Sequence, residues 1–226
     1  MEVCGILLFM QTVTKKLINY GLSDRIIRVE QLNRLIDGSD SRRHGLVNRA
    51  LKNDELLRLQ RGMYVLADHY RQQSIHPFAL AQGFAPGSYV SFETALSYHG
   101  WIPEKVFTTA SVVPGRKSRK YDNALLGNFT FTPLATEKGC FLELVARHQI
   151  DGQTVLIAAP CRALMDLVCL RKVEWEGMGW ILEGLRIDPE LLGSISINDL
   201  ETLRLVYKNQ RVKSFLSLLC EELFND

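Results

Sequence analysis

The chain has 226 residues, a formal net charge of +2 and a mean hydropathy of −0.02, and 46% of its residues are hydrophobic. This composition excludes a low-complexity chain and is typical of a globular protein with one large domain or two small ones. So small a net charge does not by itself indicate a nucleic-acid binder. The distribution of charge is more informative, because residues 1–75 hold 12 Lys and Arg against 8 Asp and Glu, whereas residues 174–226 hold 5 against 10.

The cysteines and the N-terminal segment indicate the compartment. The cysteines are odd in number, scattered and without a Cys-x-x-Cys pair, which argues against a disulfide framework and a thiolate zinc site: Cys4, Cys140, Cys161, Cys169 and Cys220. The apolar start "VCGILLFMQTV" has no basic residue before it and is too short to span a bilayer. It is interpreted as the approach to the first helix or as an arm that packs on a partner subunit. We expect a cytoplasmic protein that has no metal, cofactor or membrane contact.

Residues 1–72 are predicted to form three helices followed by a β-hairpin. Apolar residues at helical spacing place the first two helices at Val13–Tyr20 and Val29–Ile36, and "DGSD" ends the second. The third helix is expected at Ser41–Asn53. The stretch "LLRLQRGMYVL" then predicts a hairpin that turns at Arg61-Gly62, with Leu57 and Leu59 facing inward. Three helices and a two-stranded ribbon in this order predict a winged helix-turn-helix domain.

The third helix carries the candidate DNA-recognition residues. On a helical wheel its apolar face consists of Leu46, Val47, Ala50 and Leu51, and the opposite arc consists of Arg42, Gly45, Asn48, Arg49 and Lys52. Arg43 falls toward the apolar side but lies at the helix N-terminus, where it could project past the core, so it is also a predicted DNA-binding residue. Arginine forms a bidentate pair with guanine, asparagine pairs with adenine and lysine binds phosphates, so this arc suits the major groove. The alternative is that the arc is the solvated face of an amphipathic helix.

The hairpin supplies two further candidates. Arg58 and Arg61 lie on or near its tip, where a wing contacts the sugar-phosphate backbone, and Gly62 permits a tight turn. Tyr64 is expected to pack beneath the ribbon. The alternative is an ordinary hairpin packed on a core.

Residues 73–226 are predicted to form a mixed α+β domain. Strand-like runs "SYVS", "VFTTASVV", "NFTFTPL" and "TVLIAA" alternate with helical "PFALAQGF", "FETALSYHGW" and a helix opened by Pro160, and the last fifty residues look helical. A basic loop between two of the strands is a candidate second nucleic-acid contact, with Arg116, Lys117, Arg119 and Lys120. An equally supported alternative is a solvated loop that protects a sheet edge from aggregation.

Enzyme motifs give no positive indication. The sequence has no P-loop, G-x-G-x-x-G, H-E-x-x-H or G-x-S-x-G motif, and we predict no catalytic residue. His99 precedes a glycine that can end its helix, so it is interpreted as a helix C-terminal residue and not as a catalytic base. Asp199 and Glu201 could hold Mg²⁺ in a nucleotidyltransferase or nuclease, which is the least favoured hypothesis. Arg162 and Asp166, four residues apart, predict a surface or partly buried ion pair.

Three stretches together resemble the AbiEi family of antitoxins from bacterial abortive-infection (type IV) toxin–antitoxin systems. They are "LQRGMYVL", "YVSFETALSYHGW" and "VLIAAPCRALMDLVCLR", and the resemblance covers residues 28–171 in the family's order. The family usually has an acidic residue where Cys161 stands, and nothing after Arg171 aligns with it. The resemblance implies a winged helix-turn-helix repressor of its own operon, acting at inverted repeats, and a C-terminal domain that counters a nucleotidyltransferase toxin.

The sequence therefore predicts a bacterial transcriptional regulator and antitoxin that is not an enzyme. The expected partners are operator double-stranded DNA, a cognate toxin and a second copy of the chain, since one winged domain buries a small surface on DNA. The main alternative is a protein-interaction antitoxin that does not bind DNA sequence-specifically.

Overall fold

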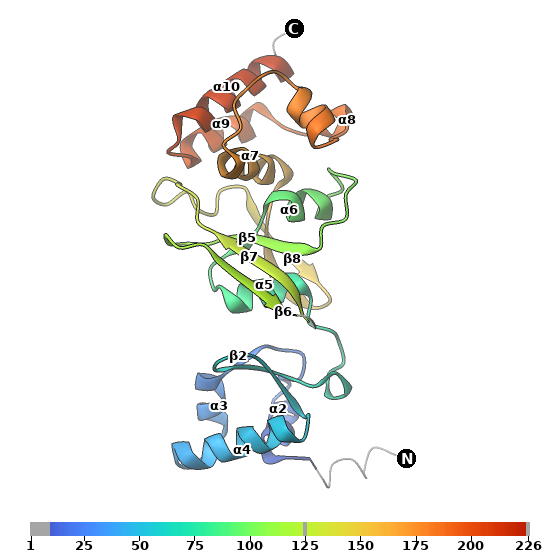
Figure 1. The fold of residues 1–226 in the computed structure, drawn as a ribbon, viewed down its shortest axis with the longest axis vertical. Coiled ribbons are helices and arrows are strands. Elements are labelled where there is room, and N and C mark those ends of the chain that lie inside the picture. The colour runs from blue at the N-terminus through green and yellow to red at the C-terminus, as the bar shows by residue number, and fades with distance from the viewer. Residues whose placement is uncertain (1–9, 124–125, 225–226) are drawn as a thin grey trace. The chain divides into compact units, whose positions relative to one another are not determined.

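The structure is a computed structural model that describes residues 10–123 and 126–224 (Figure 1). The chain divides into two compact units, one ending at His76 and the other beginning at Pro77, where the sequence had placed the boundary between residues 72 and 73. Both units combine helices with a sheet, so the predicted α+β class is confirmed. Residues 1–9, which include most of the proposed N-terminal arm, lie outside the described residues.

In the described part of the first unit, from residue 10 onward, three helices pack against a three-stranded antiparallel sheet, whose order is β1-β3-β2. Its core is built from the apolar residues that the helical spacing had selected, with Val13, Leu17, Leu32 and Ala50 almost fully buried. Tyr20 instead ends the first helix and is exposed. The elements are α2 (Thr12–Asn19), β1 (Ile27–Arg28), α3 (Val29–Leu35), α4 (Asp40–Lys52), β2 (Leu56–Gln60), β3 (Met63–Leu66) and the 3-10 turn η1 (Asp68–Tyr70).

The hairpin β2–β3 departs from the predicted alternation. Leu56 and Leu59 are buried and Leu57 is only half-buried, whereas the sequence pattern had placed Leu57 and Leu59 on one inward face. The reason is a register shift between Arg58 and Gln60, which inserts an extra residue into β2. A bulge of this kind breaks the two-residue period, and the sequence pattern assumes that the period is unbroken.

The second unit is built on a six-stranded mixed sheet of order β6-β7-β5-β4-β9-β8, in which β5 pairs with β7, and β4 with β9, in parallel. Its elements up to the last strand are α5 (Pro77–Phe84), β4 (Tyr89–Val90), α6 (Phe92–Tyr98), β5 (Thr108–Val112), β6 (Arg119–Asn123), β7 (Gly127–Thr132), β8 (Val145–Ile150) and β9 (Gln153–Ala158). A helical segment follows, made of α7 (Pro160–Arg171), the π-helix η2 (Trp180–Gly184), α8 (Pro189–Leu192), α9 (Ile197–Val206) and α10 (Gln210–Phe224).

Helices α5 and α7 contact opposite faces of this sheet. Phe84 of α5 packs edge to face against Phe129 of β7, and the Tyr89 hydroxyl of β4 donates to Asp166 of α7. Tyr89 is in register with Val112 and Thr132, an odd number of residues from Phe129, so the two aromatic side chains point to opposite faces. The larger core of the unit lies on the α7 side, where α6, α7, α9 and α10 bury their apolar residues.

Among the described residues, no helix is both long enough and apolar enough to cross a membrane.

Candidate nucleic-acid interface and a buried charge network

Helix α4 is held with one face inward and one outward. It begins after Ser39, whose Oγ accepts the backbone N–H of Arg42 at 3.4 Å and so caps the first turn. Leu46, Val47 and Ala50 are buried in the core of the first unit, as the helical wheel predicted. This packing fixes which side of the helix faces outward.

The outward side carries four of the predicted DNA-binding residues. Arg42, Asn48, Arg49 and Lys52 are all exposed. Among the described residues, none of these four side chains takes part in a hydrogen bond or ion pair. Three cations and one amide therefore present their full donor capacity along one side of a single helix.

Arg43 differs from its neighbours because its guanidinium is already engaged. Its Nε donates to the carbonyl oxygen of Ile36 at 2.9 Å, and its Nη1 lies 2.8 Å from a carboxylate oxygen of Asp40. The side chain is only 24% exposed. The structure thus directs this residue toward the turn that connects α3 to α4.

Arg58 and Arg61 are both exposed, on β2 and at the hairpin turn respectively. The turn needs Gly62, which has a φ of +75°. The Gly62 carbonyl accepts the backbone N–H of Val29 at 2.9 Å, so the turn is tied to the first residue of α3. Tyr64 is half-buried against the core, consistent with its predicted place beneath the ribbon.

The predicted basic loop of the second unit is in part a strand. Arg116 and Lys117 lie in the connection after β5, but Arg119 and Lys120 begin β6, the terminal strand on one side of the sheet. All four side chains are exposed. Arg119 is in register with Phe131 and Lys120 with Thr130, so the two strand cations point to opposite faces of the sheet.

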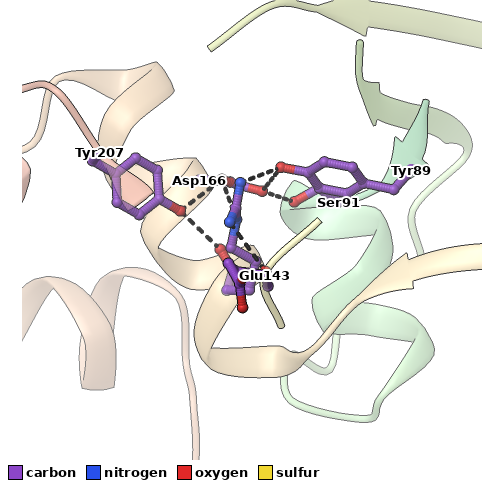
Figure 2. A network of polar contacts seen from close by, with 6 residues as sticks. Tyr89, Ser91, Glu143, Asp166 and Tyr207 are labelled. Carbon is purple, nitrogen blue, oxygen red and sulfur yellow. Dashed lines mark hydrogen bonds and ion pairs between the residues drawn. The ribbon is translucent and has the colours of Figure 1, made fainter. Parts of the chain in front are cut away.

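The densest polar cluster of the second unit is buried and surrounds the carboxylate of Asp166 (Figure 2). Its Oδ1 accepts from Arg162 Nε at 3.0 Å and from the Tyr207 hydroxyl at 2.6 Å. Its Oδ2 accepts from the Tyr89 hydroxyl at 3.0 Å and from Ser91 Oγ at 2.7 Å. Every one of these side chains belongs to a fully buried residue.

The guanidinium of Arg162 completes the cluster. Its Nη2 donates to the Tyr89 hydroxyl at 2.7 Å and its Nη1 to the Glu143 carbonyl at 3.1 Å (Figure 2). The network therefore joins α7 to β4, to the segment before β8 and to the residue that ends α9. The sequence had predicted the pair correctly but as a surface or partly buried one; the structure buries both partners completely.

The electrostatics follow from this burial. Burial alone would lower the pKa of Arg162, but Asp166 and the two tyrosines outweigh it and the pKa is raised. Burial, followed by the negative charge of Asp166, raises the pKa values of Tyr89 and Tyr207 well above the usual value of 10.0. Arg162 therefore stays charged and both tyrosines stay neutral hydrogen-bond donors, in a cluster whose residues are fully buried. This arrangement suits a structural cross-link better than a reaction centre.

The remaining candidates have local structural roles. His99 caps the C-terminal end of α6, as predicted, and its Nε2 lies 2.9 Å from the Ala158 carbonyl oxygen; burial lowers its pKa. Asp199 forms a capping box with Ser196 at the start of α9, and Glu201 is exposed on the same helix.

Burial raises the pKa of the Cys161 thiol to about 12, which keeps it protonated. In the described part of the chain, no three His, Cys, Asp or Glu side chains gather where they could hold a metal ion.

Neither a scan against protein-family models nor a search of curated proteins finds a match to this chain.

Proposed function

We propose that this protein is a DNA-binding transcriptional regulator whose first unit is a winged helix-turn-helix, with α4 as the recognition helix and β2–β3 as the wing. The element order supports this assignment, since helix, short strand, two helices and a hairpin occur in the sequence in which winged domains use them. In this interpretation α3 and α4 form the helix-turn-helix pair.

The observation that carries the proposal is the outward side of α4. Arg42, Asn48, Arg49 and Lys52 are exposed, while the opposite side of the same helix is buried in the core. Asn48 and Arg49 suit base edges, and Arg42 and Lys52 suit flanking phosphates. Arg58 and Arg61 extend the cationic surface onto the hairpin, where a wing contacts the adjacent backbone.

The proposed antitoxin role rests on the resemblance to the AbiEi family. Two of the three similar stretches lie in the second unit and cover β4–α6 and β9–α7. The buried network joins them, because Tyr89 and Ser91 come from the first of these stretches and Arg162 and Asp166 from the second. A shared architecture in the second unit would account for both stretches, and the toxin would then be a partner of that unit.

The test is a salt titration of binding to the chain's own upstream DNA, with unrelated DNA as competitor. We expect selective binding whose log affinity falls steeply with log salt, by about 0.9 for each phosphate contact. Arg49→Ala should weaken specific binding by about 1–3 kcal/mol. Arg204→Ala is the matched control, because Arg204 is also an exposed helical arginine but belongs to α9 of the second unit.

Three outcomes would contradict parts of this proposal. Full affinity retained in Arg49→Ala, or a loss no greater than that of Arg204→Ala, would remove Arg49 and its helix from the interface. A complete lack of selectivity at every salt concentration, with toxin neutralisation in cells, would favour the protein-interaction antitoxin that does not read DNA. Mg²⁺-dependent turnover that Asp199→Ala abolishes would favour the nucleotidyltransferase or nuclease.

A further inference from the structure

We infer that Lys16 and Arg43 are positioning residues that fix the turn between α3 and α4, and through it the direction in which α4 presents its side chains to DNA. The inference rests on the proposed function and deepens it, because it separates α4 residues that touch DNA from one that orients the helix. It also assigns a role to a residue of α2 that the sequence did not single out.

Lys16 reaches the turn from α2. Its Nζ donates to the carbonyl oxygen of Leu35, the last residue of α3, at 2.6 Å. The same Nζ lies 3.2 Å from a carboxylate oxygen of Asp37, whose side chain is 96% exposed. Lys16 is itself 31% exposed, so most of its stem is covered and its end is directed at the turn.

Arg43 reaches the same turn from α4. Its Nε donates to the carbonyl oxygen of Ile36, which is the next one along the chain, and its Nη1 pairs with Asp40. Two consecutive carbonyls at the end of α3 are thus each bonded to a cation, and each cation pairs with one carboxylate, Asp37 in the turn or Asp40 at the start of α4. We call Lys16, Asp37, Asp40 and Arg43 the turn clamp.

The turn clamp supplies hydrogen-bond donors to carbonyl groups at the end of α3. The last carbonyls of a helix have no partner within the helix, and the helix C-terminus carries partial negative charge, so cations are favoured there. Since the two cations come from α2 and α4, their bonds to α3 tie all three helices to one turn. Gly38, with a φ of +111°, gives that turn a conformation that other residues rarely adopt.

The consequence for DNA binding is a difference between two kinds of contact. Base-edge hydrogen bonds need their donors within a few tenths of an ångström, whereas phosphate attraction tolerates small displacements of a cation. A loosened turn should therefore lower affinity for the operator and leave affinity for unrelated DNA nearly unchanged. The loss of a phosphate contact would lower both affinities and reduce the salt slope by about 0.9.

The experiment measures operator affinity, affinity for unrelated DNA and salt slope for the full-length chain and two variants, Arg43→Lys and Lys16→Ala. Lysine keeps the positive charge but lacks the planar fork that reaches Ile36 and Asp40 at once. We expect each variant to lose on the order of tenfold in operator affinity, the size of one lost base contact, with an unchanged salt slope. Affinity for unrelated DNA should stay within about twofold, because no phosphate contact is removed.

Two further variants, Lys15→Ala and Arg42→Ala, serve as controls. Lys15→Ala removes the same charge from the neighbouring position of α2, where no clamp bond is lost, and should behave as wild type. Arg42→Ala should lower the salt slope, as a phosphate contact does. Thermal unfolding of every variant shows whether the first unit is folded at the temperature of the assay. Because Arg43→Lys keeps the charge and most of the buried stem, it gives a folded variant even if Lys16→Ala does not.

The two proposals fail in different ways. A wild-type chain that does not prefer its upstream DNA overturns both. If the wild-type chain does prefer its upstream DNA, two results would overturn the turn clamp alone. One is full operator affinity in Arg43→Lys, and the other is a lower salt slope in Lys16→Ala, as expected for Arg42→Ala.

Discussion

Asp166 stabilises the second unit because its carboxylate accepts four hydrogen bonds in a site that excludes solvent. Asp166→Asn keeps the size of the side chain but leaves the Arg162 charge buried without a counter-ion. We expect this change to lower the free energy of unfolding by about 3–5 kcal/mol, measured by chemical denaturation.

An exposed ion pair of the same unit provides the control for that change. Glu104 pairs with Arg186 at 3.1 Å, and their side chains are 49% and 66% exposed. Glu104→Gln should cost less than about 1 kcal/mol, because water screens the pair. If the two variants lost similar stability, the buried network would not be the anchor that its geometry indicates.

The two buried tyrosines make a prediction about alkaline pH. The pKa values of Tyr89 and Tyr207 are raised in the folded state by burial and then by Asp166, so only the unfolded chain releases their protons near pH 10. Their stabilising effect is complete below pH 10 and is lost as the pH rises above it, by about 1.4 kcal/mol per pH unit for each tyrosine.

Stability measured from pH 8 to pH 11 tests this expectation. Above pH 10, the free energy of unfolding of Tyr207→Phe should fall less steeply than that of wild type, by about 1.4 kcal/mol per pH unit, because one of the two tyrosines is removed. At pH 8 the variant should be less stable than wild type, because Asp166 loses a hydrogen-bond donor. Tyr98→Phe is the control, since Tyr98 is 40% exposed and lies outside the network. A slope that is equal in wild type and Tyr207→Phe would contradict the prediction.

The sequence showed the spacing of Arg162 and Asp166 but not their burial. Helical spacing alone is compatible with an exposed pair, and charged side chains are mostly exposed in folded proteins. An informative pattern was present, however, in the run from Cys161 to Val168, where every residue is buried in the structure. Its apolar residues do not keep to one side of the helix, and a helix that is apolar all round is enclosed by protein. Charges in such a helix must pair with buried partners, which here come from distant segments that the sequence does not bring together.

At the level of elements, the sequence predicted helices and strands whose hydrophobic periodicity is strong. It missed strands whose conformation depends on pairing with a neighbouring strand. Helix α4 spans Asp40–Lys52, one residue from its predicted start and end, because its apolar stripe and its Ser39 cap are both local features. Strand β1 has two residues, too few to show a period. Strands β6 and β8, "RKYDN" and "VARHQI", were not predicted since both are polar terminal strands whose conformation comes from pairing with β7 and β9.

The terminal position of β6 gives a prediction that separates the two roles of its cations. Arg119→Thr with Lys120→Thr keeps good strand formers at the sheet edge but removes the charges that discourage another strand from pairing there. We expect this double variant to aggregate more readily on mild heating, as measured by light scattering. Arg116→Thr with Lys117→Thr removes the same charge from the preceding loop and should aggregate as wild type does.

The result also bears on the second nucleic-acid contact. If these four cations bind DNA or RNA, both double variants should lower the salt slope of binding, and by similar amounts. If only the Arg119→Thr, Lys120→Thr variant aggregates and the salt slope of binding is unchanged, the strand cations protect the sheet edge and do not bind nucleic acid.

At the scale of the whole molecule, each unit has a buried core of its own. The excess of basic residues lies within the first unit, where α4 and the hairpin expose Arg42, Arg49, Arg58 and Arg61, and the acidic excess lies in the helical end of the second. This division of charge agrees with the proposal that the first unit binds DNA and the second unit binds a protein partner. Elements and charge were therefore accessible from the sequence, whereas the network that joins the similar stretches was not.

Two separate cores predict two separable unfolding transitions in the full-length chain. Leu17 and Leu203 are both fully buried, the first in the smaller core and the second in the larger. Leu17→Ala and Leu203→Ala should each cost about 2–5 kcal/mol, but in different calorimetric transitions. The chain's upstream duplex should raise only the transition that Leu17→Ala lowers, because a ligand stabilises the unit that binds it. A single transition that both substitutions shift equally would show that the two cores unfold as one, and a duplex that raised the Leu203 transition would move the DNA contact to the second unit.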